Sequence, residues 1–186
     1  LGSNNIVPGY AAYAFANQAD VLVNTRHAAD AAGATKMDRP EWTAVNPKNG
    51  DVYLTLTNNS ARALASTDAA NPRYYNDPKG AAKTAQRGNP NGHVVRFADA
   101  NRDPAATSFT WDVYLFGSRA TMSADINASG LTEDNDFSSP DGMWFSQAAA
   151  GLMWLQTDDG KFTDATNCMM LAALPGQVGD GGKRTL

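Results

Sequence analysis

The 186-residue sequence has one cysteine, two histidines and no run of basic residues. Cys168 has no partner for an internal disulfide, so cysteine usage does not identify the redox compartment. A net charge of −4 without a basic run argues against a nucleic-acid partner. No apolar stretch approaches the roughly 20 residues that a membrane-spanning helix needs. The composition therefore indicates a domain that does not bind nucleic acid and does not span a bilayer.

Several familiar catalytic patterns are also missing. No glycine-rich loop leads into a helix, so a cradle for nucleotide phosphates is not indicated. Ser60 has no nucleophile-elbow context, and no Ser-His-Asp set is visible. His27 and His93 lack the spacing of a metal-binding pair, so we predict structural roles for both. Cys168 precedes an apolar run and is predicted to be buried in a strand. The core is also predicted to include the four tryptophans, Trp42, Trp111, Trp144 and Trp154.

The two ends of the sequence suggest a piece of a longer protein. The first residues, "LGSNNIVPGY", lack the basic-then-apolar pattern of a signal peptide. The last residues, "GDGGKRTL", indicate a turn that leads into a strand. With 42% hydrophobic residues, the chain can still bury a core of its own. We therefore expect residues 1–186 to form a single fragment of a larger protein.

The hydrophobic pattern predicts one α-helix followed by strands. Apolar residues recur at helical spacing from Phe15 to Val23, and Gly33 offers a stop, so a helix is predicted over about 12–32. Beyond it, apolar and polar residues alternate around turn-rich clusters. Hairpins are predicted at about 41–58, 93–116 and 142–158, and a further strand pair begins within 167–186. The long segment between the first two hairpins has no period and is predicted to be a functional or mobile loop.

A repeat relates two of the hairpins. Pro40-Glu41 recurs 100 residues later as Pro140-Asp141, and at the same offset Thr57-Asn58 falls on Thr157-Asp158. Repeated hairpins at intervals of about 40 to 50 residues are typical of a β-propeller. The predicted fold class is therefore mainly β, a partial propeller of about three blades from a six-bladed ring, with one N-terminal helix. A β-sandwich is the alternative.

The repeat also suggests a site. If residues just before the inner strand of each blade face the central channel, Glu41 and Asp141 converge there. Two carboxylates repel each other unless a positive charge lies between them, and oxygen-rich sites select hard cations such as Ca²⁺. Arg39 lies two residues from Glu41 and would flank the same space in an extended segment. Its planar fork suits phosphate, and a metal with an arginine stabilises a phosphoryl transition state.

Each of these residues has a simpler interpretation. Arg39 and Glu41 could form no more than a salt bridge with each other at a strand end. Asp141 lies in "SPDG", and Pro-Asp-Gly is a turn signal wherever it occurs. The "TDDG" stretch at 157–160 could bind calcium, although such a cluster is usually a solvated turn.

The stretch "GATKMDRPEWTAVNPKNGDVYLTLTNNS" closely resembles the C-terminal half of PhoX-type alkaline phosphatases. "TWDVYLFG" and "SSPDGMWF" follow in that family's order, so the resemblance covers nearly the whole chain. It implies a six-bladed propeller that hydrolyses phosphomonoesters at a cluster of calcium and ferric iron. It also implies export to the periplasm or beyond, usually by the twin-arginine route. In the motif "RPEW", it implies that Arg39 contacts phosphate and that Glu41 is a metal ligand; the aspartate of "PDGMWF" makes Asp141 a second ligand.

The sequence departs from that family by its length. PhoX-type enzymes are much longer, and their N-terminal blades supply an iron-binding cysteine and further carboxylates. Cys168 lies in a different context and does not take that role. We therefore expect calcium and iron in the full-length parent, partnership with its remaining blades, and an inactive isolated fragment. Two rival functions stay open, a non-enzymatic propeller module that binds a partner and a calcium-stabilised structural domain.

Overall fold

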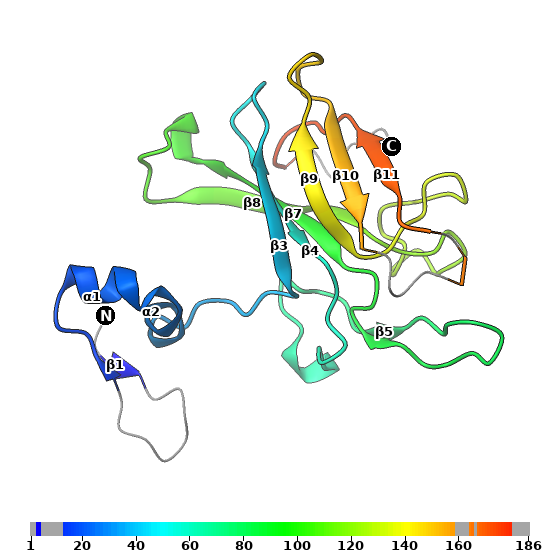
Figure 1. Ribbon diagram of the computed structural model, residues 1–186, viewed down its shortest axis with the longest axis horizontal. Helices are drawn as coiled ribbons and strands as arrows, with labels where there is room; N and C mark the ends of the chain where they lie inside the picture. The colour runs from blue at the N-terminus through cyan, green and yellow to red at the C-terminus, as the bar shows by residue number, and fades with distance from the viewer. Residues whose placement is uncertain (1–2, 5–12, 159–163, 166, 180–186) are drawn as a thin grey trace. The chain divides into compact units, whose positions relative to one another are not determined.

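The computed structural model describes residues 3–4, 13–158, 164–165 and 167–179. They belong to two compact units, Leu1–Lys36 and Met37–Leu186 (Figure 1). The expectation of a single fragment did not include this division.

The first unit combines a short strand pair with two short helices. Strand β1 (Ser3–Asn4) pairs with the antiparallel strand β2 (Tyr13–Ala14). Helices α1 (Gln18–Val23) and α2 (Thr25–Ala31) follow. The prediction of one helix over 12–32 is therefore wrong at its start and in its continuity.

Local hydrogen bonds explain the difference. The Asp20 carboxylate accepts from the Tyr13 hydroxyl at 2.6 Å and from the Ala16 amide at 2.9 Å, which holds the preceding segment in an extended turn. Asn17 then caps α1, with its side-chain oxygen accepting from the Asp20 amide. At Asn24, the backbone leaves helical geometry, and the side-chain amide donates to the Asp20 carboxylate at 2.8 Å and to the Asp20 carbonyl at 3.2 Å. Asparagine competes for backbone groups in this way and interrupts the helix.

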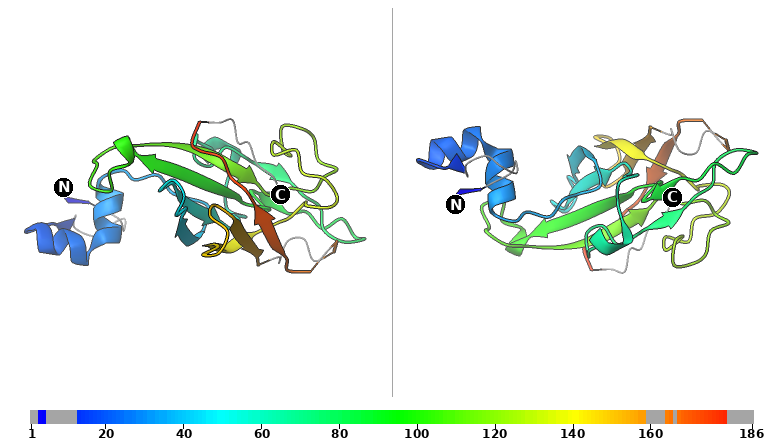
Figure 2. Two further views of the ribbon diagram at one scale, coloured as in Figure 1. Left: turned by 90° about the horizontal axis from the view of Figure 1, so that it is seen from above. Right: turned by 90° about the horizontal axis from the view of Figure 1, so that it is seen from below.

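The second unit contains a four-stranded and a three-stranded antiparallel sheet. The order of the first is β3-β4-β7-β8 and that of the second is β11-β10-β9. The long strands β7 and β8 lie side by side in both views of Figure 2. The strands are β3 (Pro40–Val45), β4 (Val52–Leu56), β7 (His93–Asp99), β8 (Phe109–Phe116), β9 (Pro140–Phe145), β10 (Met153–Thr157) and β11 (Met170–Ala173).

The strands of these two sheets lie within the predicted hairpins and the final strand pair, except that β3 begins one residue and β9 two residues earlier than predicted; their grouping also differs. Turns at Gly50 and Gly151, both with positive φ, close the first and third hairpins. Leu56 of β4 pairs with His93 of β7, so the first two hairpins share one sheet. Within the described residues, the three predicted hairpins thus form two sheets rather than three separate blades. The intervening loop returns the chain to the edge of β4, a pairing that hairpin spacing does not reveal.

The core lies between the two sheets. The ring of Tyr53 on β4 makes edge contacts with Tyr114 on β8 and with Phe145 on β9, at centroid distances of 5.5 and 5.3 Å. Strand β3 also lies against β9. The buried cluster comprises Ala44, Tyr53, Val94, Tyr114, Leu115, Leu131, Phe137, Met143, Phe145, Met153, Leu155 and Ala173.

The tryptophans mostly lie outside this core. Trp42 is 47% exposed and Trp144 is 58% exposed, so their predicted burial is wrong, as it is for Trp111. On β9, the neighbours Met143 and Phe145 take the core face, and Trp144 points the other way because side chains alternate along a strand. Cys168, also predicted to be buried, is exposed.

The long segment between β4 and β7 is held by buried polar contacts. It contains the 3₁₀ turn η1 (Leu64–Ser66) and the strand pair β5 (Tyr75–Asn76) and β6 (Arg87–Gly88); a second turn, η2 (Ala100–Arg102), follows β7. The Arg73 guanidinium is buried and donates to the Gly117 and Ile126 carbonyls, both at 2.9 Å.

Candidate active site

The matching Pro-acid motifs share an uncommon backbone conformation. Arg39 and Ser139 each precede a proline that begins a strand, and both have positive φ, +54° and +56°. Few non-glycine residues adopt this region. At each position, the carbonyl oxygen accepts a hydrogen bond from the backbone amide of the residue just after the partner strand, β4 for Arg39 and β10 for Ser139. The donors are Thr57 to Arg39 at 3.0 Å and Asp158 to Ser139 at 2.9 Å. The sequence repeat is therefore also a structural repeat.

Side chains from the first hairpin hold the beginning of β9 in place. The Thr55 hydroxyl donates to the Asp141 carbonyl at 2.8 Å, and the Thr57 hydroxyl donates to the Pro140 carbonyl at 3.0 Å. Both threonines are fully buried. The beginnings of β3 and β9 therefore lie side by side, and the acids at their second positions come with them.

The Arg39 guanidinium makes two contacts in the described residues. One arm, Nη2, lies 3.1 Å from Glu41 Oε1, and the other, Nη1, donates to Asn58 Oδ1 at 3.1 Å. The side chains of Arg39 and Glu41 are 53% and 37% exposed. The simpler interpretation, a salt bridge at a strand end, is thus present in the structure. Such an exposed pair contributes about 0–1 kcal/mol.

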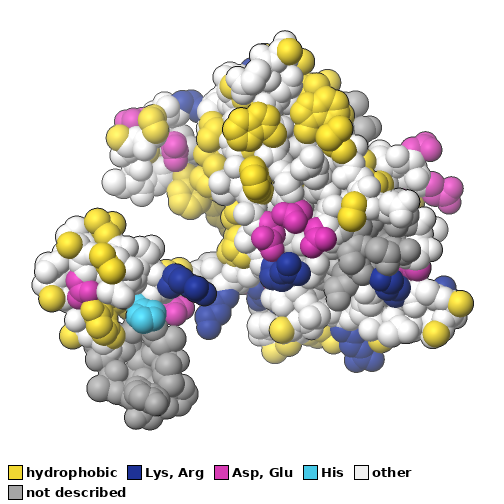
Figure 3. All heavy atoms as spheres, viewed as in Figure 1, with side chains coloured by type: hydrophobic (Ala, Val, Ile, Leu, Met, Phe, Trp, Pro, Cys, Tyr) yellow, Lys and Arg dark blue, Asp and Glu magenta, His cyan; other side chains and the backbone are white. Residues whose placement is uncertain are grey.

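Asp141 lies in a field of like charge. Burial raises its pKa, and the negative charges of Glu41 and Asp158 raise it further, while Arg39 acts in the opposite direction. Glu41, Asp158 and Arg39 thus all lie near enough to Asp141 to act on its charge, and Figure 3 shows acidic side chains grouped beside a basic one on this face. The structure brings together all three residues singled out from the sequence, Arg39, Glu41 and Asp141.

Two polar residues next to this group were not among the predicted site residues. Asp158 belongs to the "TDDG" stretch, and Asn58 occupies the matching place in "TNNS". Each follows the second strand of its hairpin. The alignment of Thr57-Asn58 with Thr157-Asp158 was the available signal. Among the residues that the structure describes, no group of three His, Cys, Asp or Glu side chains is arranged to hold a metal by itself.

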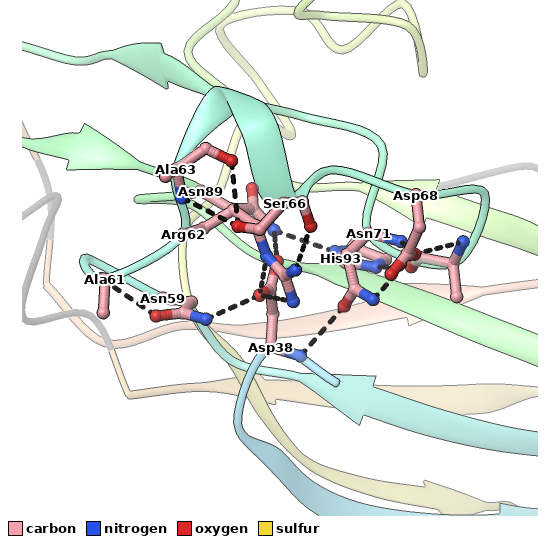
Figure 4. Close-up of polar contacts among 11 residues, drawn as sticks. Asp38, Asn59, Ala61, Arg62, Ala63, Ser66, Asp68, Asn71, Asn89 and His93 are labelled. Atoms are coloured by element: carbon pink, nitrogen blue, oxygen red, sulfur yellow. Dashed lines mark hydrogen bonds and ion pairs between the residues drawn. The ribbon is translucent and has the colours of Figure 1, made fainter. Parts of the chain in front are cut away.

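A buried ion pair anchors the residue before Arg39 (Figure 4). Asp38 is fully buried, and its carboxylate accepts from Nε and Nη2 of Arg62, both at 2.8 Å. Asn59 and Asn89 donate to the same carboxylate at 2.8 and 3.0 Å. The Asp38 backbone amide also donates to the Asn71 side-chain oxygen at 3.0 Å, so the backbone that leads into Arg39 is held on its buried side.

His93 completes this buried network. Its Nδ1 accepts from the Asn89 side chain at 2.9 Å, and its Nε2 donates to the Ala70 carbonyl at 2.7 Å. Burial and the positive charge of Arg73 lower its pKa to about 4. A neutral, fully buried imidazole with both nitrogens engaged fits the structural role predicted for it.

The family of the chain follows from comparison with known proteins. The family model for alkaline phosphatase PhoX matches residues 5–183. The chain belongs to the PhoX alkaline phosphatase family. The resemblance read from the DRPEW and PDGMWF motifs is thereby confirmed.

Among solved structures, the chain is similar to Pseudomonas fluorescens PhoX in complex with vanadate, a transition state analogue. The TM-score is 0.68 and the sequence identity is 36%, over 86% of this chain and 27% of that chain. This chain therefore spans about a quarter of that PhoX. The comparison with curated proteins found no match. The mainly β, antiparallel architecture is consistent with a part of PhoX, and no helix in the described ranges is long and apolar enough to cross a membrane.

Proposed function

We propose that this chain works as part of a longer, metal-dependent PhoX phosphatase that hydrolyses phosphomonoesters. Family membership and the likeness to a PhoX bound to vanadate support a phosphate-directed activity. The observation that carries the proposal is the pairing of two matched strand beginnings, which gathers Arg39, Glu41 and Asp141 on one surface. The alternatives, a partner-binding module and a calcium-stabilised domain, do not require an arginine among these acids.

The proposed setting of this site is a six-bladed propeller. Strands β3 and β9 each come first along the chain in their sheet and lie at its edge. The two strands lie against each other. In a propeller, the first strands of neighbouring blades line the central channel in this way. The two sheets would then be two neighbouring blades, and other blades of the parent would complete the ring.

The acids fit part of a site for a hard cation. Glu41, Asp141 and Asp158 offer carboxylate oxygens. Burial raises the pKa of Asp141, and the negative charges of Glu41 and Asp158 raise it further, against the opposing effect of Arg39. Calcium takes roughly six to eight oxygen ligands, so calcium and ferric iron would need further ligands from the rest of the parent. When bound, such metals polarise a phosphoryl oxygen and lower the pKa of a bound water.

The chain's own contribution is charge placed in a fixed geometry. Glu41 now neutralises one arm of Arg39 across 3.1 Å. Engagement of Glu41 by a cation would release that arm to donate to a phosphate oxygen. Arg39 would then offset the negative charge on the equatorial oxygens during phosphoryl transfer. Because part of the ligand set is missing, we propose that the isolated chain is inactive. We also propose that the parent is exported to the periplasm or beyond by the twin-arginine route.

The test is hydrolysis of p-nitrophenyl phosphate by the full-length enzyme. Arg39→Ala should lower kcat/KM by about 10²–10³-fold, as the loss of one transition-state donor does elsewhere. The matched control is Arg87→Ala, which removes an exposed arginine from β6 and should leave kcat/KM unchanged. Full activity of Arg39→Ala would favour the calcium-stabilised domain, and absence of hydrolysis by the wild-type enzyme would favour the binding module.

A further inference from the structure

The side-chain amide of Asn58 contacts Arg39, the proposed phosphate-binding residue, and forms hydrogen bonds through both its oxygen and its nitrogen. Asn58 is 7% exposed. Its Oδ1 accepts from Nη1 of Arg39 at 3.1 Å, and its Nδ2 donates to the Ser139 hydroxyl at 3.1 Å. The amide thus connects the residues that precede Pro40 and Pro140, at the beginnings of the two repeat strands.

The Ser139 end of this connection is rigid. Ser139 is fully buried, its amide donates to the Asn91 carbonyl at 3.0 Å, and its hydroxyl lies 3.0 Å from that of Ser138. Asp141 lies two residues further on. The position of Asn58 therefore depends on the same backbone that positions Asp141.

The Arg39 end needs such an anchor. An unrestrained arginine side chain has many rotamers to lose on ordering, and this one is half exposed. Its contact with Glu41 would be given up when Glu41 binds a cation. Of the two contacts that the guanidinium makes in the described part of the chain, the one with Asn58 would remain. Only Nη1 is used by Asn58, so Nη2 stays available for phosphate.

We infer that Asn58 is a positioning residue, which holds the Arg39 guanidinium in register with Asp141 so that one arm points at the phosphate. This inference rests on the proposed function of Arg39. An amide suits the task because it accepts from the guanidinium and donates to Ser139 without adding charge. A carboxylate at position 58 would neutralise Arg39 and would bring another negative charge to the surface that already holds Glu41, Asp141 and Asp158.

The experiment is a double-mutant cycle in the full-length enzyme, with inorganic phosphate as a competitive inhibitor and p-nitrophenyl phosphate as substrate. Asn58→Ala should raise the inhibition constant of phosphate about tenfold, the usual effect of losing one hydrogen bond to a charged group. In the Arg39→Ala background, the same change should have no further effect, because Asn58 acts through Arg39.

Asn127→Ala is the matched control for burial. Asn127 is 9% exposed, and its amide both donates to and accepts from the backbone of Leu131, at 2.9 and 2.8 Å. This variant should lower the melting temperature and leave the inhibition constant unchanged. The near-isosteric Asn58→Asp covers the case in which Asn58→Ala does not fold, and it should also weaken phosphate binding.

The inference is overturned if Asn58→Ala changes the inhibition constant less than twofold. It is equally overturned if the change is as large with Arg39 removed, or if Asn58→Asp binds phosphate as tightly as the wild type. An Arg39→Ala enzyme with wild-type kinetics would instead defeat the proposed function of Arg39, so the two failures are distinguishable.

Discussion

Removal of the Asp38 carboxylate should be among the most costly changes in the chain. The Asp38 side chain is fully buried: Arg62, itself 6% exposed, contacts it with two nitrogens, and Asn59 and Asn89 add two amide hydrogen bonds. Asp38→Ala removes the shared carboxylate acceptor of the buried Arg62 guanidinium, the buried Asn89 amide and the half-buried Asn59 amide. Removing one partner of such a buried pair costs about 3–5 kcal/mol of unfolding free energy.

The exposed pair of the same site supplies the comparison. Glu41→Gln removes the Arg39 contact at 3.1 Å, but both side chains are more than a third exposed, so the loss should be about 0–1 kcal/mol. The unfolding free energies of both variants and of wild type are measured by urea unfolding of the chain in the presence of a chelator, with tryptophan fluorescence as the signal. If Asp38→Ala costs no more than Glu41→Gln, the argument that burial decides the value of these ion pairs is refuted.

Two further predictions concern the acids and His93. In the full-length enzyme, Glu41→Gln and Asp141→Asn should each abolish phosphatase activity. In the presence of a chelator, the melting temperature of Asp141→Asn should equal or exceed that of wild type, because repulsion from Glu41 and Asp158 is relieved. Marked destabilisation by Glu41→Gln would favour the salt bridge over the metal site. For His93, the folded pKa of about 4 lies below the ordinary 6.5, so the unfolded chain binds the proton more readily between these values. Stability should therefore fall as the pH drops from about 6.5 towards 4, by on the order of 3 kcal/mol, and urea unfolding of His93→Gln should lack that part of the pH dependence.

Local sequence signals predicted the strands well and the helix poorly. Alternation and turn residues such as Gly50 depend on neighbours along the chain, so hairpin limits could be read directly. The helical pattern from Phe15 to Val23 was also local, but it competed with the side chains of Asp20 and Asn24, which form hydrogen bonds that interrupt the helix. Periodicity alone does not weigh such competition.

The tryptophans show a different limit. Alternation establishes that Trp144 and Phe145 point to opposite faces of β9. It does not establish which face meets the other sheet, because that depends on the partner. Phe145 meets Tyr53 at 5.3 Å, and Trp144 is left 58% exposed. The prediction that the tryptophans are buried therefore lacked the information that determines which face of a strand is buried.

The sequence by itself determined the family, the hairpins and the three charged residues of the candidate site, because the Pro-acid repeat and the DRPEW motif are contiguous along the chain. Only the tertiary structure decided which residues surround them. The Asn58–Ser139 contact joins residues 81 positions apart, and Asn89 reaches Asp38 across 51 positions. Such contacts form because burial leaves each polar group in need of a partner, and the fold, rather than the spacing in sequence, determines which partner is within reach.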